Sequence, residues 1–131
     1  MKIALITDDG QSIGRHFGRA PYYLVLTVEN GQIVRREMRD KLNHSHFAQE
    51  PHSEAPGQPH GFGPEEQDRH TRMAQPIADC EAVLCGGMGR GAYQSLQASG
   101  IRPIVTDLLD IDEAMLAYIE GRIVDRIDML H

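Results

Sequence analysis

Two glycine-rich segments carry most of the side chains that could do chemistry. The first, residues 12–20, reads Ser-Ile-Gly-Arg-His-Phe-Gly-Arg-Ala and sets His16 among glycines and arginines. A neutral imidazole is the commonest protein ligand of metals, and arginine attracts anions. The alternative is a structural histidine that bonds only to the backbone. On the first interpretation the binding residues are Ser12, Arg15, His16, Gly18 and Arg19.

The second segment, residues 85–91, reads Cys-Gly-Gly-Met-Gly-Arg-Gly. It follows a short apolar run and precedes a helical pattern, so its backbone N–H groups and the positive helix start favour an anion. The alternative is a tight turn whose glycines only satisfy unusual backbone angles. Neither a Walker loop nor a dinucleotide fingerprint is present. The candidate cofactor contacts here are Cys85, Gly86, Gly87, Met88, Gly89 and Gly91.

Cys85 closes the apolar run, at the end of a strand where α/β sheets place ligands. The helix start after it is expected to lower its pKa and to offer a thiolate to a soft metal, unless the side chain is packed as an apolar residue. Cys80 is interpreted as structural. Cys80 and Cys85 lack the C-x-x-C spacing of a redox or zinc pair and are too few for a disulfide scaffold.

A third candidate is the segment from 43 to 70, which holds five of the seven histidines and four of the seven prolines. Such a composition buries little, so we expect a mobile loop over about residues 41–63. His44 and His46 are secondary candidate ligands for zinc, nickel or copper. The alternative is a solvated loop with incidental metal affinity.

The aspartates Asp8, Asp9, Asp107 and Asp110 suggest an acidic two-metal site. No third acid lies within a predicted strand, and Asp110 is better placed to cap a helix. We therefore expect no catalytic residues and no enzyme. A metal-dependent hydrolase using Asp8 and Asp107 remains an alternative.

The elements that must position these residues follow from hydrophobic patterning. Strands are expected at residues 2–7, 82–85 and 101–106, and the runs 22–29 and 32–37 flank Asn30-Gly31, the strongest short signal of a hairpin. Helices are expected from Pro64 to about Pro76, from the glycine turn to Gly100, and from Asp110 to Gly121. This order predicts an α/β sandwich with a mixed sheet.

Composition narrows the functional class. The net charge is −6 and no cluster of Lys and Arg stands out, which argues against nucleic acid and anionic membranes as partners. No run approaches the length of a membrane helix and the N-terminus does not resemble a signal peptide, so we expect one cytoplasmic domain over 1–131. A charged hairpin edge (Arg35, Arg36, Glu37) favours a monomer.

Three motifs in order resemble the dinitrogenase iron–molybdenum cofactor biosynthesis family, which includes nitrogenase cofactor carriers and molybdenum–copper orange proteins. They are residues 16–23 (His-Phe-Gly-Arg-Ala-Pro-Tyr-Tyr), residues 85–89 with Gly91-Ala92, and residues 100–103 (Gly-Ile-Arg-Pro). The resemblance implies a ribonuclease-H-like three-layer sandwich with a mixed five-stranded sheet and without nuclease activity.

The same resemblance implies a function. The expected role is non-covalent carriage or scaffolding of an anionic metal–sulfur cluster of the Fe–Mo, Mo–Cu or Fe–S type. By position, His16 would be its ligand or hydrogen-bond donor, and the turn from Gly86 to Gly91 would supply backbone donors. Partners would be proteins that deliver or accept the cluster. A divalent-metal protein using the histidine-rich loop is the principal alternative.

Overall fold

The computed structural model describes residues 1–41 and 73–130 and contains a five-stranded sheet in the order β3-β2-β1-β4-β5. The strands are β1 (Lys2–Thr7), β2 (Tyr22–Glu29), β3 (Gln32–Asp40), β4 (Ala82–Cys85) and β5 (Arg102–Val105). The central strand β1 pairs antiparallel with β2 and parallel with β4, and β4 pairs parallel with β5. The predicted mixed sheet is confirmed.

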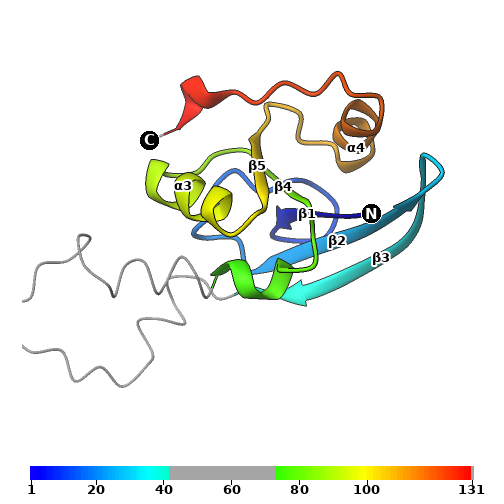
Figure 1. Ribbon diagram of the computed structural model, residues 1–131, viewed down its shortest axis with the longest axis horizontal. Helices are drawn as coiled ribbons and strands as arrows, with labels where there is room; N and C mark the ends of the chain where they lie inside the picture. The colour runs from blue at the N-terminus through cyan, green and yellow to red at the C-terminus, as the bar shows by residue number, and fades with distance from the viewer. Residues whose placement is uncertain (42–72, 131) are drawn as a thin grey trace, which may run out of the picture.

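Helices cover both faces of the sheet. Alternate residues of β1 serve opposite cores: Ile3 and Leu5 face the core that contains α4 (Ile111–Ile119), whereas Ala4 and Ile6 face the core beneath α3 (Arg90–Ala98). The short helix η1 (Gln75–Ile77) packs in the second core through Ile77. The molecule thus has three layers, with α3 and α4 on opposite sides of the sheet (Figure 1).

The local turns follow the predicted chemistry. Asn30 and Gly31, between β2 and β3, have φ of 53° and 77°, as a two-residue hairpin turn requires. The Asp110 carboxylate accepts a hydrogen bond of 2.8 Å from the Glu113 N–H and so caps α4. Gly100 and Gly121 follow the two helices with φ of 81° and 75°.

The C-terminal segment covers the β5 edge of the sheet. The Val105 N–H donates to Asp125 Oδ1 at 2.9 Å, and the Arg126 N–H donates to the Val105 carbonyl at 2.7 Å. A short helix, η2 (Ile127–Met129), follows. The β3 edge instead carries charged side chains, which discourage pairing with another strand.

A cluster of ion pairs and hydrogen bonds connects β3 with η1 and the residues that follow η1. The Arg39 guanidinium donates to both Asp79 carboxylate oxygens, at 2.7 and 3.0 Å, and to the Pro76 carbonyl at 2.7 Å. Lys2 reaches the same carboxylate at 3.1 Å. The hydrogen bonds from Arg39, above all, hold the pKa of Asp79 well below its usual range.

We expect Asp79→Asn to destabilise the fold by about 1 kcal/mol near neutral pH, after discounting for solvent because the Asp79 side chain is 43% exposed. A carboxyl group whose pKa is depressed by folding stabilises above its unfolded pKa, so the difference from wild type should shrink once the pH falls below about 4 and vanish only below the depressed pKa of the folded state. Urea unfolding against pH measures this. Asp112→Asn removes an exposed pair with Arg36 and should change stability by less than about 0.5 kcal/mol at every pH.

Lys41 lies at the start of the predicted loop and is buried. The loop was expected from about residue 41, yet the Lys41 side chain is 0% exposed and its N–H donates to the Pro21 carbonyl at 2.9 Å. Tertiary packing decides this position, because a lysine after an exposed edge strand has no sequence signal of burial. Most of the predicted helix from Pro64, and the rest of the predicted loop, lie outside the described residues.

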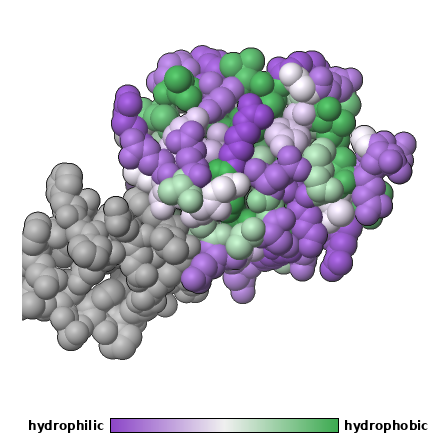
Figure 2. Space-filling view, viewed as in Figure 1, coloured by the Kyte–Doolittle hydropathy of each residue, from purple (hydrophilic) through white to green (hydrophobic). Residues whose placement is uncertain are grey.

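Polar side chains dominate the face shown in Figure 2, with apolar side chains in separate groups along its upper side. Within the part of the chain that the structure describes, no helix combines the length and the apolar character that a bilayer crossing needs.

Candidate anion-binding pocket

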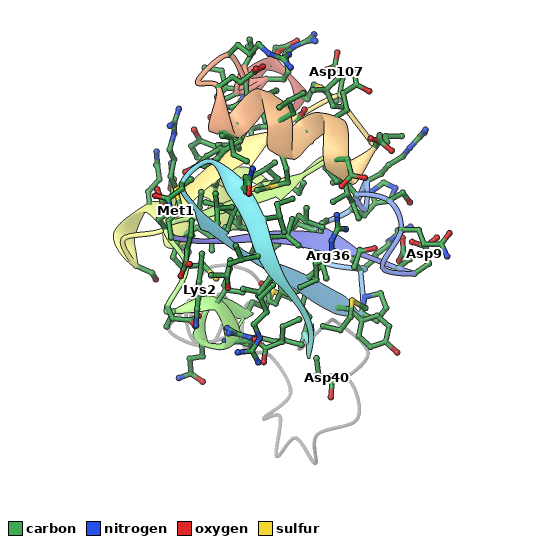
Figure 3. The ribbon with its side chains drawn as sticks, turned by 90° about the vertical axis from the view of Figure 1, so that its right-hand side faces the viewer. Met1, Lys2, Asp9, Arg36, Asp40 and Asp107 are labelled. Atoms are coloured by element: carbon green, nitrogen blue, oxygen red, sulfur yellow. The ribbon has the colours of Figure 1, made fainter. Side chains whose placement is uncertain are left out.

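The three parallel strands bring their carboxyl ends to one edge of the sheet. The connections that leave β1, β4 and β5 therefore meet there, as ligand sites of α/β sheets commonly do. Figure 3 shows Asp9, just after β1, on the opposite side of the molecule from Met1 and Lys2. The connection after β1, residues 8–21, is the longest of the three and forms most of the site.

Backbone hydrogen bonds join this connection to its neighbours. The Gly86 N–H donates to the Gly14 carbonyl at 2.7 Å, and the Phe17 N–H donates to the Gly87 carbonyl at 2.9 Å. A Cβ atom on Gly86 would lie 2.9 Å from the Arg15 Cα, so only glycine fits this approach. The glycine-rich turn after β4 thus supports the histidine segment from behind.

Thr7 and Asp9 organise the first part of the connection. Thr7 Oγ1 donates to the Ser12 carbonyl at 2.7 Å and accepts from the Gly10 N–H at 2.8 Å. The Asp9 carboxylate accepts from the Gln11 N–H at 2.9 Å, and backbone hydrogen bonds of this kind lower its pKa. Asp9 is therefore a turn-forming residue in this structure.

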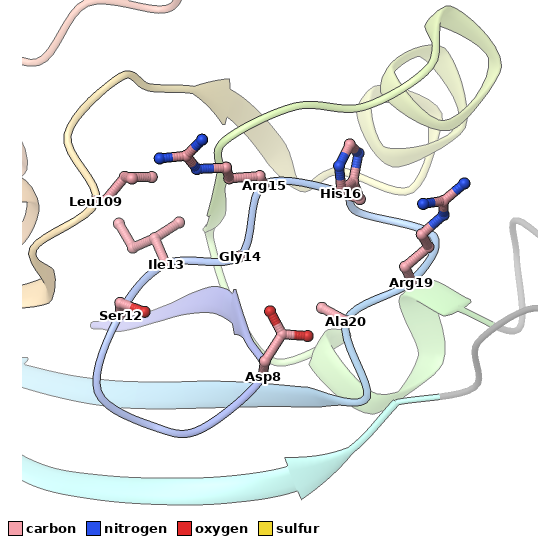
Figure 4. A pocket seen from close by; sticks show the side chains of 9 residues that line it. All are labelled: Asp8, Ser12, Ile13, Gly14, Arg15, His16, Arg19, Ala20 and Leu109. Carbon is pink, nitrogen blue, oxygen red and sulfur yellow. The ribbon is translucent and has the colours of Figure 1, made fainter.

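The connection encloses a pocket of about 380 Å³. It is lined by Asp8, Ser12, Ile13, Gly14, Arg15, His16, Arg19, Ala20 and Leu109. In Figure 4 the side chains of Arg15, His16 and Arg19 project from the same side of the connection, while Asp8 points toward it from the end of β1. Four of the predicted residues, Ser12, Arg15, His16 and Arg19, are thereby brought together.

The backbone adds donors to this pocket. The Arg19 and Ala20 N–H groups both donate to the His16 carbonyl, at 3.1 Å each, and so close a tight turn over Phe17 and Gly18. The N–H groups of the lining residues Arg15 and His16 donate to none of the other described residues. Such donors beside two guanidinium groups make a site suited to an anion.

The glycine turn does not line this pocket. It was expected to supply backbone donors to a ligand, but here it supports the histidine segment. The Gly86 N–H is already bonded to Gly14, and Met88 is 1% exposed, so neither is presented to a ligand there. Gly89 and Arg90 form the start of α3, where no side chain caps the helix. Gly18, Gly87 and Gly91 are also absent from the lining.

Cys85 corrects the thiolate prediction. Its side chain is 0% exposed, and burial raises the pKa of the thiol to about 12, more than a hydrogen bond from the Gly87 backbone lowers it. The expected lowering of this pKa by the helix start is therefore wrong, because desolvation outweighs it. Burial likewise raises the pKa of Cys80 to about 12.

Comparison with known proteins defines the family. Residues 1–121 match the model of the dinitrogenase iron–molybdenum cofactor family. The chain belongs to this family. An uncharacterized protein of Methanocaldococcus jannaschii is 27% identical over 125 residues, which make up 94% of this chain and 89% of that protein.

Two other proteins are similar to this chain. The FeMo cofactor biosynthesis protein NifB of Frankia alni is 24% identical over 126 residues, covering 93% of this chain but 21% of NifB. The apo orange protein of Desulfovibrio gigas has the same fold, with a TM-score of 0.64, 22% identity, and coverage of 96% of this chain and 92% of its own.

The carboxylates of this iron–molybdenum cofactor family member do not gather into a metal site within the described residues. Asp107 accepts a hydrogen bond of 3.0 Å from Arg126 and lies outside the pocket lining, whereas Asp110 caps α4. Among residues 1–41 and 73–130, no three His, Cys, Asp or Glu side chains are placed to hold one ion. His44 and His46 lie outside the described residues.

Sequence reasoning missed the apolar wall of the pocket. Ile13 and Leu109 face each other in Figure 4, and the Ile13 N–H donates to the Leu109 carbonyl at 2.9 Å. The available signal was the position of Leu109 in the short connection after the parallel strand β5, at the edge where such sheets bind ligands.

Proposed function

We propose that this protein binds and carries an anionic metal–sulfur cofactor in the 12–20 pocket without catalysing a reaction. The observation that carries the proposal is that Arg15, His16 and Arg19 line one pocket at the carboxyl edge of the sheet, beside backbone N–H groups that donate to no other described residue. This cluster of donors occurs in a chain whose net charge is −6. Membership of the dinitrogenase iron–molybdenum cofactor family supports a metal-containing cargo.

Each group has a role suited to such a cargo. The exposed His16 imidazole would coordinate a metal or donate to a sulfide, and the two arginines would neutralise the charge of the cluster. Ile13 and Leu109 would shield its apolar side. A pocket of about 380 Å³ lies within the usual size range of small-molecule sites. The proposed cargo contains molybdenum or iron, with copper as a further candidate metal.

The strand order β3-β2-β1-β4-β5 supports a ribonuclease-H-like classification. The charged β3 edge and the covered β5 edge support a monomer. A carrier exchanges its cargo with other proteins, so we propose cytoplasmic partners that deliver or accept the cluster at this open pocket.

The test is an anaerobic titration of the purified protein with tetrathiomolybdate, with and without copper, followed by visible absorbance and gel filtration. We expect saturable binding that co-elutes with the protein. His16→Ala should weaken it by about tenfold or more, since a lost charge-assisted hydrogen bond or metal ligand costs about 1.5–3 kcal/mol. The melting temperature should stay near that of wild type because His16 is exposed.

Two further results separate the alternatives. Deleting residues 43–63 should leave tetrathiomolybdate binding intact, whereas a divalent-metal protein would lose zinc or nickel binding. Turnover of RNA–DNA hybrids with magnesium or manganese would favour the hydrolase alternative. Unchanged affinity in His16→Ala would remove His16 from the site.

A further inference from the structure

Lys41 carries a buried charge next to the segment that forms the pocket. Its side chain is 0% exposed, and its Nζ atom is buried without a hydrogen-bond partner among the described residues. A buried ammonium group without a counter-charge is costly, so proteins rarely retain one. Lys2 and Lys41 are the two lysines of the chain, and Lys2 instead forms an ion pair at the surface.

Among the described residues, two aromatic rings make favourable contacts with this charge. The Lys41 Nζ atom lies 4.6 Å from the centroid of the Phe17 ring and 5.8 Å from that of Tyr23. Phe17 and Tyr23 also contact each other, with centroids 6.3 Å apart. Cation–π contacts compensate part of the desolvation of an ammonium group but do not replace a hydrogen bond or an anion.

Two of the three contacts described for Lys41 are to the segment that forms the pocket. Phe17 lies directly between His16 and Gly18, and the Lys41 N–H donates to the Pro21 carbonyl, next to the lining residue Ala20. The ammonium group thus sits behind the turn that presents His16 and Arg19. Protein rather than water lies around it, so its field is weakly screened.

We infer that the buried Lys41 ammonium acts through its field as a determinant of anion affinity in the 12–20 pocket, and that a bound anion supplies the counter-charge it lacks. This inference rests on the proposed function. Lys41 does not touch the cargo, so its role differs from that of Arg15, His16 and Arg19. A unit charge about 12 Å from an anion, at an effective dielectric constant of about 20, changes the affinity for that anion by about tenfold.

The proton state of Lys41 links affinity to pH. Burial lowers the pKa of Lys41 to about 8, while the charge of a Cys85 thiolate would act in the opposite direction. The titratable groups that face it in the described structure are Tyr23 on β2 and Cys85 on β4, and burial raises the pKa of both. Neither ionises near pH 8, so of these three groups only Lys41 should change charge there.

Anion binding and protonation of Lys41 are thermodynamically linked, which determines how affinity changes with pH. An anion binds the charged form of Lys41 more tightly, so binding raises the pKa of Lys41 and takes up a proton at a pH above 8. Affinity should therefore fall as the pH rises through this region. Tetrathiomolybdate is a suitable ligand because its own charge does not change in this range.

The experiment is calorimetric titration with tetrathiomolybdate from about pH 7 to about pH 9.5, in buffers of different ionisation enthalpy. Wild type should lose about tenfold in affinity across this range and take up about half a proton on binding at about pH 8.5. Lys41→Met should bind about tenfold more weakly at about pH 7, with no such pH dependence and no proton uptake. Lys41→Arg should stay tight throughout, because guanidinium does not deprotonate.

Lys2→Met is the matched control, since it removes the same charge at the start of β1, at the end of the strand away from the pocket. Its affinity and pH dependence should match those of wild type. His16 is present in all four proteins, so its contribution is common to every profile. If Lys41→Met fails to fold, the wild-type profile and the Lys41→Arg profile decide the question. If Lys41→Met keeps the affinity and pH dependence of wild type, the role inferred for Lys41 is wrong, but the proposed function still stands. No binding by wild type would instead contradict the proposed function, and this inference with it.

Discussion

Gly86→Ala is expected to destabilise the protein by about 3 kcal/mol and to weaken cofactor binding at a site that Gly86 does not line. The new methyl group would meet two backbone atoms, the Arg15 Cα at 2.9 Å and the Gly14 oxygen at 3.1 Å. Backbone cannot rotate away as a side chain can, so the two connections must separate. That movement strains the 2.7 Å hydrogen bond from the Gly86 N–H to Gly14 and displaces the neighbouring Arg15.

Thermal unfolding and the tetrathiomolybdate titration measure the two effects. A loss of about 3 kcal/mol corresponds to a fall in Tm of about 10 °C for a domain of this size. Gly91→Ala is the matched control, because Gly91 is exposed within α3 and alanine is the better helix former there. It should unfold at or slightly above the wild-type temperature. Equal stability of the two variants would contradict the close packing of the two connections.

Replacing both pocket arginines, in Arg15→Gln/Arg19→Gln, should weaken tetrathiomolybdate binding by about 100-fold while the fold stays intact. Both side chains are exposed and line the pocket, so the variant removes charge without removing core packing. Each charge-assisted hydrogen bond to an anion contributes about 1.5–3 kcal/mol, which makes this the largest expected effect on binding. The salt dependence of affinity should become shallower, because fewer charges are paired with the anion.

The control for this variant carries the same change of charge elsewhere. Arg35 lies on the exposed edge strand β3, and Arg122 follows the end of α4 that is remote from Asp110. Arg35→Gln/Arg122→Gln should bind within about twofold of wild type. If it loses as much affinity as the pocket variant, net charge rather than the pocket governs binding, and the site must be sought elsewhere.

Much of the architecture could be predicted from local sequence. Asn30-Gly31 specified the hairpin because both residues accept positive φ, and Asp110 specified the start of α4 because its carboxylate caps the helix. The apolar run in residues 82–85 predicted a strand covered on both faces, as found for β4. The grouping of Ser12, Arg15, His16 and Arg19 also followed from their nearness in sequence, since one connection carries all four.

The roles of Cys85, Gly86 and Lys41 were decided by tertiary structure. From the sequence, Cys85 and the glycine turn had the form of a ligand site, but packing against the histidine segment buried the thiol and consumed the Gly86 N–H. Leu109 joined the pocket only because β5 lies two strands from β1 in the sheet. Local patterns determine turns, caps and strands because those depend on near neighbours. Burial, and with it the pKa of a thiol or an ammonium group, depends on which distant segments fold over a residue.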